Sequence, residues 1–231
     1  MLSTIIALSV LGGVLCLDRI VIQAMVSRPI VLAPLMGWLI GIPLAGLIIG
    51  AMLELFWIDR IPIGIYIPPN DSASAVLAVS IAGLAGPKTG AIVPEIIALA
   101  LLLAIPCGLL IRLFDVKIIE SNNRLSDEAL EDAKLGHLRA IEKKTYLALG
   151  KAAIVYVGAL FLFQVLIVYP VAALYPGLPD ALIQTLKLTY YFMPLLGIAT
   201  AIAAIKMRGA IPLFCAVFLI LAIAWELFHV L

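Results

Sequence analysis

Long runs without a charged residue alternate with short polar stretches along the chain. Seven runs stand out, the fourth interrupted by Glu95 alone: residues 1–17, 29–53, 72–87, 89–111, 152–179, 188–205 and 209–225. A helix perpendicular to the bilayer needs about 20 apolar residues to cross the hydrocarbon core. The run at 29–53 is therefore long enough to cross as one helix, as is the first part of the run at 152–179, and the run at 89–111 is nearly so.

The run at 72–87 is short and carries Ser72, Ser74 and Ser80 together with two glycines. It predicts a re-entrant or broken segment, which is tolerated at membrane depth only where protein or a water-filled cavity shields it from lipid. Together the runs predict an all-α fold. We expect a polytopic integral membrane protein with about six to seven membrane segments, some of them broken or re-entrant.

Composition supports a membrane protein and narrows the possible partners. Hydrophobic residues make up 65% of the 231 positions and charged residues 13%, whereas soluble domains are usually about 45–50% apolar and about 25% charged. So little polar surface cannot cover a water-soluble protein, and lipid must take the place of water. The net charge of +1 leaves no basic face for nucleic acid. The three cysteines lie in separate apolar runs without the spacing of a metal site, and no metal or cofactor is expected.

Residues 112–151 differ in character from the rest of the chain. They hold eight of the fifteen Lys and Arg residues and seven Asp and Glu residues. Ser126 or Asp127 can cap a helix there, whose ragged apolar stripe predicts that it lies on the membrane surface. The concentration of positive charge assigns the loop at 115–151 to the cytoplasm, and the C-terminus then falls on the opposite side. The predicted regions are N-terminal membrane segments at 1–111, the cytoplasmic loop or helix at 112–151 and C-terminal membrane helices at 152–231.

The polar residues between positions 18 and 71 indicate a binding site. Glu54 follows about 25 uncharged residues, and a carboxylate near such a span costs roughly 2.5–3.5 kcal/mol to insert, so it should face a polar interior. Gly46 and Gly50, spaced four apart, let another backbone approach the helix face on which Glu54 follows one turn later. Residues 61–71 hold three prolines and a glycine, which prevent a regular helix. Unwound backbone beside buried polar side chains is typical of substrate sites in transporters.

The chemistry of these polar residues suits a sugar. A hexose presents neighbouring hydroxyls, from which a carboxylate can accept in pairs and with which an amide can both donate and accept. An indole offers an apolar face for the C–H side of the sugar ring. The candidate substrate-binding residues are Glu54, Asn70, Asp71, Asp18, Gln23 and Trp57. Structural roles stay open as well, with Glu54 as a structural acid and Trp57 as an anchor at the membrane interface.

A series of short motifs runs from Arg28 to Asp71. In order they are Arg28-Pro29, Gly37 and Gly41, Gly46 and Gly50, Glu54-Leu55, Pro62-Ile63-Gly64 and Pro68-Pro69-Asn70-Asp71. On these residues the chain resembles the IIC subunits of the mannose/fructose/sorbose phosphotransferase family, and residues 206–222 resemble that family more loosely. The chain departs from the family pattern at Ile42, where an Asp is usual.

The resemblance implies a sugar-translocating subunit in the inner membrane of a bacterium. In this family the IIC chain pairs with a IID membrane chain, and together they bind and move a hexose of the mannose, fructose, sorbose or amino-sugar class. Soluble IIA and IIB phosphocarrier proteins phosphorylate the sugar at the cytoplasmic face, so the chain would belong to an oligomeric complex and would not be an enzyme on its own. Two alternatives stay open: an ion- or proton-coupled secondary transporter that uses Glu54 and Asp71 as relay groups, and a membrane scaffold that transports nothing.

Overall fold

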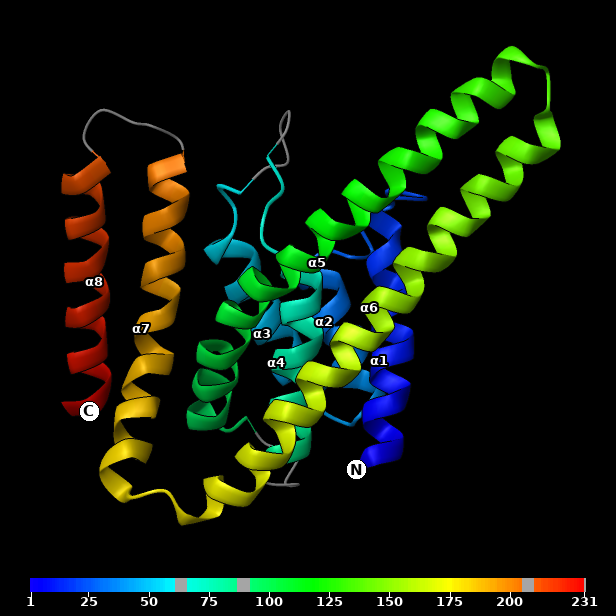
Figure 1. The fold of residues 1–231 in the computed structure, drawn as a ribbon. Coiled ribbons are helices and arrows are strands. Elements are labelled where there is room, and N and C mark those ends of the chain that lie inside the picture. The colour runs from blue at the N-terminus through cyan, green and yellow to red at the C-terminus, as the bar shows by residue number, and fades with distance from the viewer. Residues whose placement is uncertain (61–65, 87–91, 205–209, 231) are drawn as a thin grey trace.

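All regular secondary structure is helical in the part of the chain that the computed structural model describes, residues 1–60, 66–86, 92–204 and 210–230. The helices are α1 (Leu2–Cys16), α2 (Pro29–Leu39), α3 (Pro43–Phe56), α4 (Asp71–Ala85), α5 (Pro94–Lys134), α6 (Leu138–Leu174), α7 (Asp180–Ala204) and α8 (Ala210–Val230), with 3-10 turns at Leu17–Arg19 and Tyr175–Gly177 (Figure 1). Among the described residues, α1 together with the 3-10 turn that follows it (Leu2–Arg19), α5, α6 and α7 are long and apolar enough to cross a membrane. Helices α2, α3 and α4 and the part of α8 at Phe214–Trp225 are shorter apolar helices. The predicted all-α membrane fold is confirmed.

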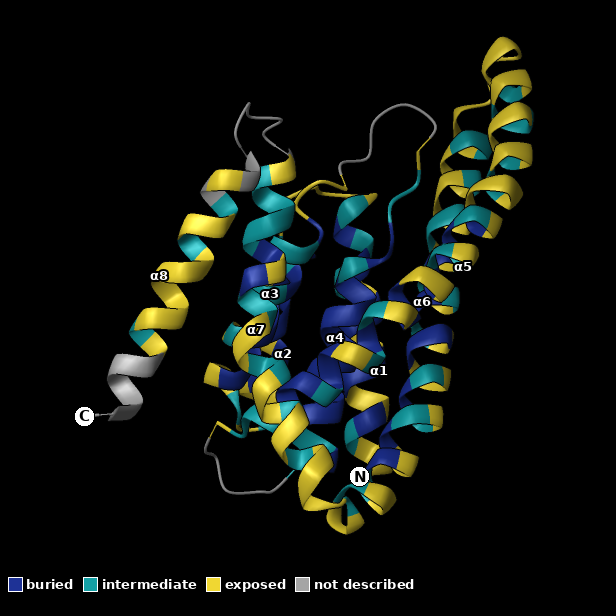
Figure 2. Ribbon diagram, turned by 90° about the vertical axis from the view of Figure 1, so that its left-hand side faces the viewer, coloured by how far each residue is buried: buried dark blue, intermediate teal, exposed yellow. Residues whose placement is uncertain are grey.

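Helix α4 lies at the centre of the bundle. It packs against α1, α2, α3, α5 and α6, while α7 packs against α3 and α5, and α8 packs mainly against α7. Burial follows this arrangement, since the buried residues concentrate on α4 and on the faces turned toward it, whereas α8 is largely exposed (Figure 2). The centre of the protein is therefore shielded from lipid, and the exposed apolar side chains of the outer helices are suited to face it.

Residues 29–53, which we predicted to form one spanning helix, form a helical hairpin instead. Helix α2 ends at Leu39, Gly41 takes a left-handed φ of +81°, and Pro43 opens α3. The single-helix prediction is wrong because Pro43 has no N–H to continue the hydrogen-bond ladder and because Gly41 adopts the left-handed conformation that ends helices without a steric penalty.

The two helices of this hairpin touch backbone to backbone. A Cβ on Gly46 would lie 2.5 Å from the carbonyl oxygen of Ala33, and a Cβ on Gly50 would lie 2.4 Å from that of Pro29. Only glycine fits at such distances. The prediction that another backbone approaches this face of α3 is therefore confirmed, and the backbone is that of α2.

Helix α4 corrects one part of its prediction. We expected a broken or re-entrant segment at 72–87 that protein shields from lipid. Asp71–Ala85 is one uninterrupted helix, so the segment is not broken, and 12 of its 15 residues are buried, so it is shielded as predicted. Its three serine hydroxyls all donate to carbonyl oxygens: Ser72 to Ser27 at 2.6 Å, Ser74 to Ala104 at 2.9 Å and Ser80 to Val76 at 2.7 Å. The serines do not break the helix because neighbouring helices surround it and their own hydrogen bonds are satisfied.

The charged segment forms a projecting hairpin rather than a helix on the membrane surface. Helices α5 and α6 both continue beyond the bundle and meet at a turn where Gly136 has a φ of +74° (Figure 1). Ser126 and Asp127 lie inside α5, so neither caps a helix, and the predicted boundaries after residues 111 and 151 fall within α5 and α6. The prediction of a separate surface helix is wrong because α5 runs without a break through the region where that helix was predicted to begin, and Lys144 pairs with acids of α5 across the hairpin.

Two contacts show this pairing across the hairpin. Lys144 of α6 contacts both Glu128 and Asp132 of α5, and Lys151 donates to the Ser121 hydroxyl at 2.9 Å. These contacts hold the two helices of the hairpin together. The cytoplasmic location of residues 115–151 stays a prediction.

Candidate functional site

Polar side chains gather where the end of α1, the start of α4 and the middle of α5 meet. We call Asp18, Arg19, Asn70, Asp71 and Asp115 the polar cluster. Asp18, Asn70 and Asp115 are buried, with exposed fractions of 8%, 1% and 7%. Charged and amide groups buried this deeply must be paired, and the pairings define the geometry of the site.

Asn70 caps α4 and joins it to α5. Its Oδ1 accepts from the backbone N–H of Ala73 at 2.9 Å, which satisfies a free donor of the first helical turn. Its Nδ2 donates to both carboxylate oxygens of Asp115, at 3.2 and 3.1 Å, and its backbone N–H donates to the Gly108 carbonyl at 3.0 Å. Asp115 also forms a side-chain hydrogen bond with Tyr156 of α6. The amide therefore joins α4 to α5, and α6 contacts the pair through Asp115.

Asp71 is the next residue, and it forms an ion pair with Arg19 at the end of α1. Its Oδ1 also accepts from the backbone N–H of Ser72 at 2.6 Å. The side chain of Arg19 is 30% exposed and that of Asp71 13%. This pair is thus the most accessible charged part of the cluster, although it sits at the end of an otherwise enclosed helix.

Asp18 holds the loop that leads from α1 to α2. Its Oδ1 accepts from the backbone N–H of Ala24 at 2.9 Å, and its Oδ2 accepts from the N–H and the hydroxyl of Ser27 at 3.2 and 3.3 Å. Gln23 and Met25 in this loop have left-handed φ values of 56° and 62°, which is unfavourable for residues other than glycine. The hydrogen bonds to Asp18 compensate for this conformation.

The loop also brings the start of α2 to α4, through the bond from the Ser72 hydroxyl to the Ser27 carbonyl. Gln23 itself is exposed, and its Nε2 reaches the carbonyl of Arg19 at 3.4 Å. Of these loop residues, Asp18 therefore belongs to the cluster, whereas Gln23 lies at its outer edge.

Glu54 lies one turn beyond Gly50 and faces the start of α2. Its Oε1 pairs with the Arg28 guanidinium at 3.1 Å, and its Oε2 accepts from the backbone N–H of Ile30 at 3.5 Å. The Glu54 side chain is 27% exposed and that of Arg28 50%. Among the described residues, Glu54 is therefore connected to the cluster through Arg28 and the neighbouring Ser27.

Trp57 lies beside the cluster. It is buried, with 8% exposed, and its ring edge reaches Gly108 of α5, where a Cβ would lie 3.1 Å from Cη2. Gly108 is also the residue whose carbonyl accepts from Asn70. The indole therefore packs inside the protein, close to the start of α4.

The structure thus brings together Asp18, Asn70, Asp71 and Trp57 of the six predicted residues, with Glu54 beside them and Gln23 on the exposed loop. The sequence reasoning missed Arg19, Asp115 and Tyr156. Asp115 was counted with the charged loop, but a signal was present: it follows Gly108 by seven residues, so the two lie on one face of a helix. No comparable signal pointed to Tyr156.

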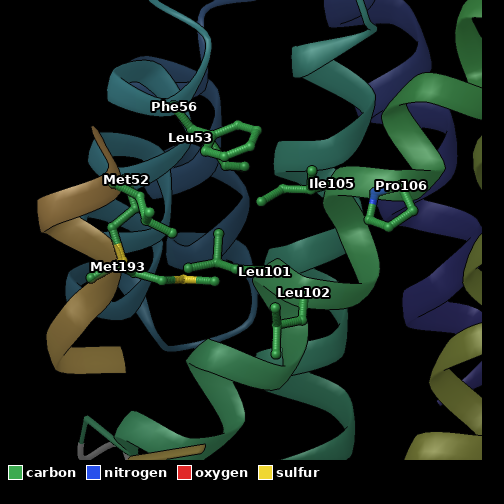
Figure 3. Close-up of a pocket in the computed structure, with 9 residues that line it drawn as sticks. Met52, Leu53, Phe56, Leu101, Leu102, Ile105, Pro106 and Met193 are labelled. Carbon is green, nitrogen blue, oxygen red and sulfur yellow. The ribbon is translucent and has the colours of Figure 1, made fainter. Parts of the chain in front are cut away.

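A cavity of about 260 Å³ lies elsewhere, between α3, α5 and α7. Figure 3 shows its lining, which includes Met52, Phe56, Leu101 and Met193 and is apolar throughout. A sugar needs hydrogen-bond partners for its hydroxyls. This cavity has none to offer from its side chains, and the polar cluster is the better candidate site.

A buried polar cluster at the end of an enclosed helix, inside a bundle whose outer helices can face lipid, defines an integral membrane protein of the transporter class. Comparison with known families gives the particular kind. The family described as the sorbose-specific IIC component of the phosphotransferase system matches residues 2–229, and the chain belongs to this family. It is therefore a sugar-translocating membrane subunit of a phosphotransferase system and works with other components of that system in a membrane complex.

Comparison with solved structures supports the fold alone. A chain titled "Structure of membrane protein" is similar with a TM-score of 0.70 over 99% of this chain and 91% of that one, at 18% sequence identity. A search of the curated proteins found no match.

Proposed function

We propose that this chain binds a hexose at the polar cluster and carries it across the inner membrane of a bacterium together with a IID membrane subunit. The Arg19–Asp71 ion pair is the observation that carries the proposal. A guanidinium donates in a fixed fork and a carboxylate accepts from two sides, so the pair can open and offer both kinds of partner to neighbouring sugar hydroxyls. Hydroxyls that replace the ion pair keep both charged groups hydrogen-bonded.

The other predicted residues have supporting positions in this proposal. Trp57 offers an apolar surface beside the start of α4 against which the C–H face of a sugar can rest. Glu54 adds a further carboxylate next to the cluster, and Asp18 with Gln23 shapes the loop that borders it. Both ends of the Asn70 amide already have partners within the protein. Asn70 therefore supports the site without binding the sugar directly, unlike Asp71.

The position of the cluster favours delivery of the sugar to soluble phosphocarrier proteins. Asp115 and Ile118 are the last buried residues of α5, and beyond them the helix continues into the charged hairpin (Figure 1). Positive charge in such a hairpin favours the cytoplasmic side, and the cluster then lies near the cytoplasmic end of the bundle. A IIB protein, phosphorylated in turn by a IIA protein, would there transfer the phosphoryl group and trap the sugar inside.

The test is uptake of labelled hexoses by cells that lack their own carriers for them. We expect uptake, with accumulation of the sugar phosphate, when the chain is produced with its IID and IIB partners and not when IID is omitted. Asp71→Asn should lower uptake at limiting sugar roughly tenfold, since a hydrogen bond to a charged group contributes about 1.5–3 kcal/mol. Asp127→Asn, at an exposed position of the hairpin, is the control and should leave uptake unchanged.

Two results would contradict the proposal. Accumulation of unmodified sugar that stops when the proton gradient is collapsed would support a secondary transporter instead. Assembly of a stable complex that takes up none of the hexoses tested would support a scaffold.

A further inference from the structure

Asn70 and Asp115 are buried and bind each other, so their contact needs an explanation other than sugar binding. Asn70 is 1% exposed and Asp115 7%, and the carboxylate accepts from the amide with both oxygens, at 3.2 and 3.1 Å. The side-chain oxygen of Asn70, Oδ1, accepts from the backbone N–H of Ala73 at 2.9 Å. Each end of the amide therefore has a partner inside the protein.

The start of α4 is attached to α5 at further points of the same stripe. The Ser74 hydroxyl donates to the Ala104 carbonyl at 2.9 Å, and the Asn70 N–H donates to the Gly108 carbonyl at 3.0 Å. Residues 104, 108 and 115 are spaced four and seven apart, which places them on one face of the helix. At Gly108 the contact is close, since a Cβ there would lie 2.1 Å from the Ser74 hydroxyl oxygen.

We infer that Asp115 is a positioning residue: it holds the amide of Asn70, and through it the first turn of α4, so that Asp71 stands opposite Arg19. The inference rests on the proposed function of the polar cluster. Asn70 then serves as a fixed attachment of α4 rather than as a partner of the sugar. Asp71 is the next residue along the chain, so a displaced Asn70 moves the carboxylate that faces Arg19.

An exchange of the two side chains tests this role. Asn70→Asp alone sets two buried carboxylates against each other, although Asp caps a helix as well as Asn does. Asp115→Asn alone removes the charge and one of the two accepting oxygens. In the double variant Asn70→Asp/Asp115→Asn the amide and the carboxylate change places, so one donor again faces one acid and α4 keeps its cap. Asn123→Asp, at an exposed position of α5, controls for the added charge.

The wild type, the two single variants, the double variant and the Asn123→Asp control are each produced with the IID and IIB partners. Folded complex is measured by size-exclusion chromatography, and sugar uptake by its maximum rate and its half-saturating concentration. We expect Asn70→Asp to lower folded complex about tenfold and the exchange to restore it to within about twofold of the wild type. For Asp115→Asn we expect folded complex near the wild-type level and a half-saturating concentration raised about tenfold, which corresponds to about 1.4 kcal/mol. The exchange should restore the half-saturating concentration as well.

Three outcomes would overturn the inference. An exchange that restores the complex but not uptake would mean that the Asn70 amide contacts the sugar itself. An exchange that restores neither would mean that the pairing does not hold the site. An unchanged half-saturating concentration in well-folded Asp115→Asn would show that Asp115 positions nothing that the sugar senses. Absence of uptake in the wild type would instead overturn the proposed function, and rescue of folded complex by the exchange would still establish the pairing.

Discussion

Replacement of Glu54 by Gln separates a sugar contact from a structural acid. The substitution keeps the shape of the side chain and removes its charge. If Glu54 accepts hydrogen bonds from sugar hydroxyls, affinity for the sugar falls while the protein still assembles. If Glu54 only fastens the start of α2 to α3, assembly suffers and the affinity of the surviving protein does not change.

The cost of losing the structural contacts of Glu54 can be compared with the cost of losing a hydrogen bond to the sugar. The ion pair with Arg28 joins side chains that are 27% and 50% exposed, and pairs of this kind contribute about 0–1 kcal/mol. The contact with the Ile30 N–H, at 3.5 Å, is at the outer limit of a hydrogen bond, and the Gln carbonyl can keep it. Loss of a charged acceptor for a hydroxyl costs about 1.5–3 kcal/mol, or roughly ten- to a hundredfold in affinity. The binding effect should therefore exceed the structural one.

The assay uses one preparation for three measurements: the amount of protein in the membrane, co-purification with the IID subunit, and sugar affinity. Glu128→Gln is the matched control, because Glu128 is also an acid in an accessible ion pair, here with Arg124 of the same helix. We expect normal assembly of both variants and weakened sugar binding for Glu54→Gln alone. Unchanged affinity in well-assembled Glu54→Gln would refute the reasoning and leave Glu54 a structural role.

The remaining predictions concern topology, packing and partners. Reporter fusions at Asn122 and after Leu231 should report opposite sides of the membrane, and the same side at both would contradict the charge argument. Gly50→Ala should destabilise the protein by about 1–3 kcal/mol, because its Cβ would lie 2.4 Å from the Pro29 carbonyl; Gly158→Ala, which meets nothing within 4 Å, should be neutral or stabilising by thermal unfolding. The purified single chain should bind hexose weakly or not at all by calorimetry, since in the proposed complex a IID subunit completes the site, and tight binding would refute this dependence.

Hydrophobic patterning predicted the class of fold because lipid imposes a simple rule on long apolar runs. It could not predict where a run is divided. The run at 29–53 has the length of one spanning helix, yet Gly41 and Pro43 turn it into a hairpin. The spacing of Gly46 and Gly50 correctly predicted a close backbone contact, but a spacing carries no information on which backbone provides it.

The candidate site was predictable in part for a similar reason. Polar residues among apolar runs are conspicuous, and Asp18, Asn70 and Asp71 were found in this way. Asp115 was hidden by its charged neighbours, although in the structure it faces inward to Asn70 while the rest of its segment projects away from the bundle. Charge density along a sequence cannot distinguish one inward-facing acid from those around it.

The segment at 61–71 was predicted to be non-helical. Its first part, residues 61–65, lies outside the described residues. Residues 66–70 form no helix, as predicted, and Asp71 is the first residue of α4.

The enclosure of α4 has a consequence for biosynthesis. A 15-residue helix is about 22 Å long, which is shorter than the roughly 30 Å hydrocarbon core. Because it is short and carries three serines, α4 is poorly suited to move from the translocon into lipid by itself. The helices that cover it on two sides, α5 and α6, are translated later. We therefore expect α4 to stay near the translocon until α6, which ends at Leu174, has been inserted. A ribosome stalled before that point would hold a chain whose central helix has no stable place in the membrane, and such a chain would be a substrate for membrane quality control.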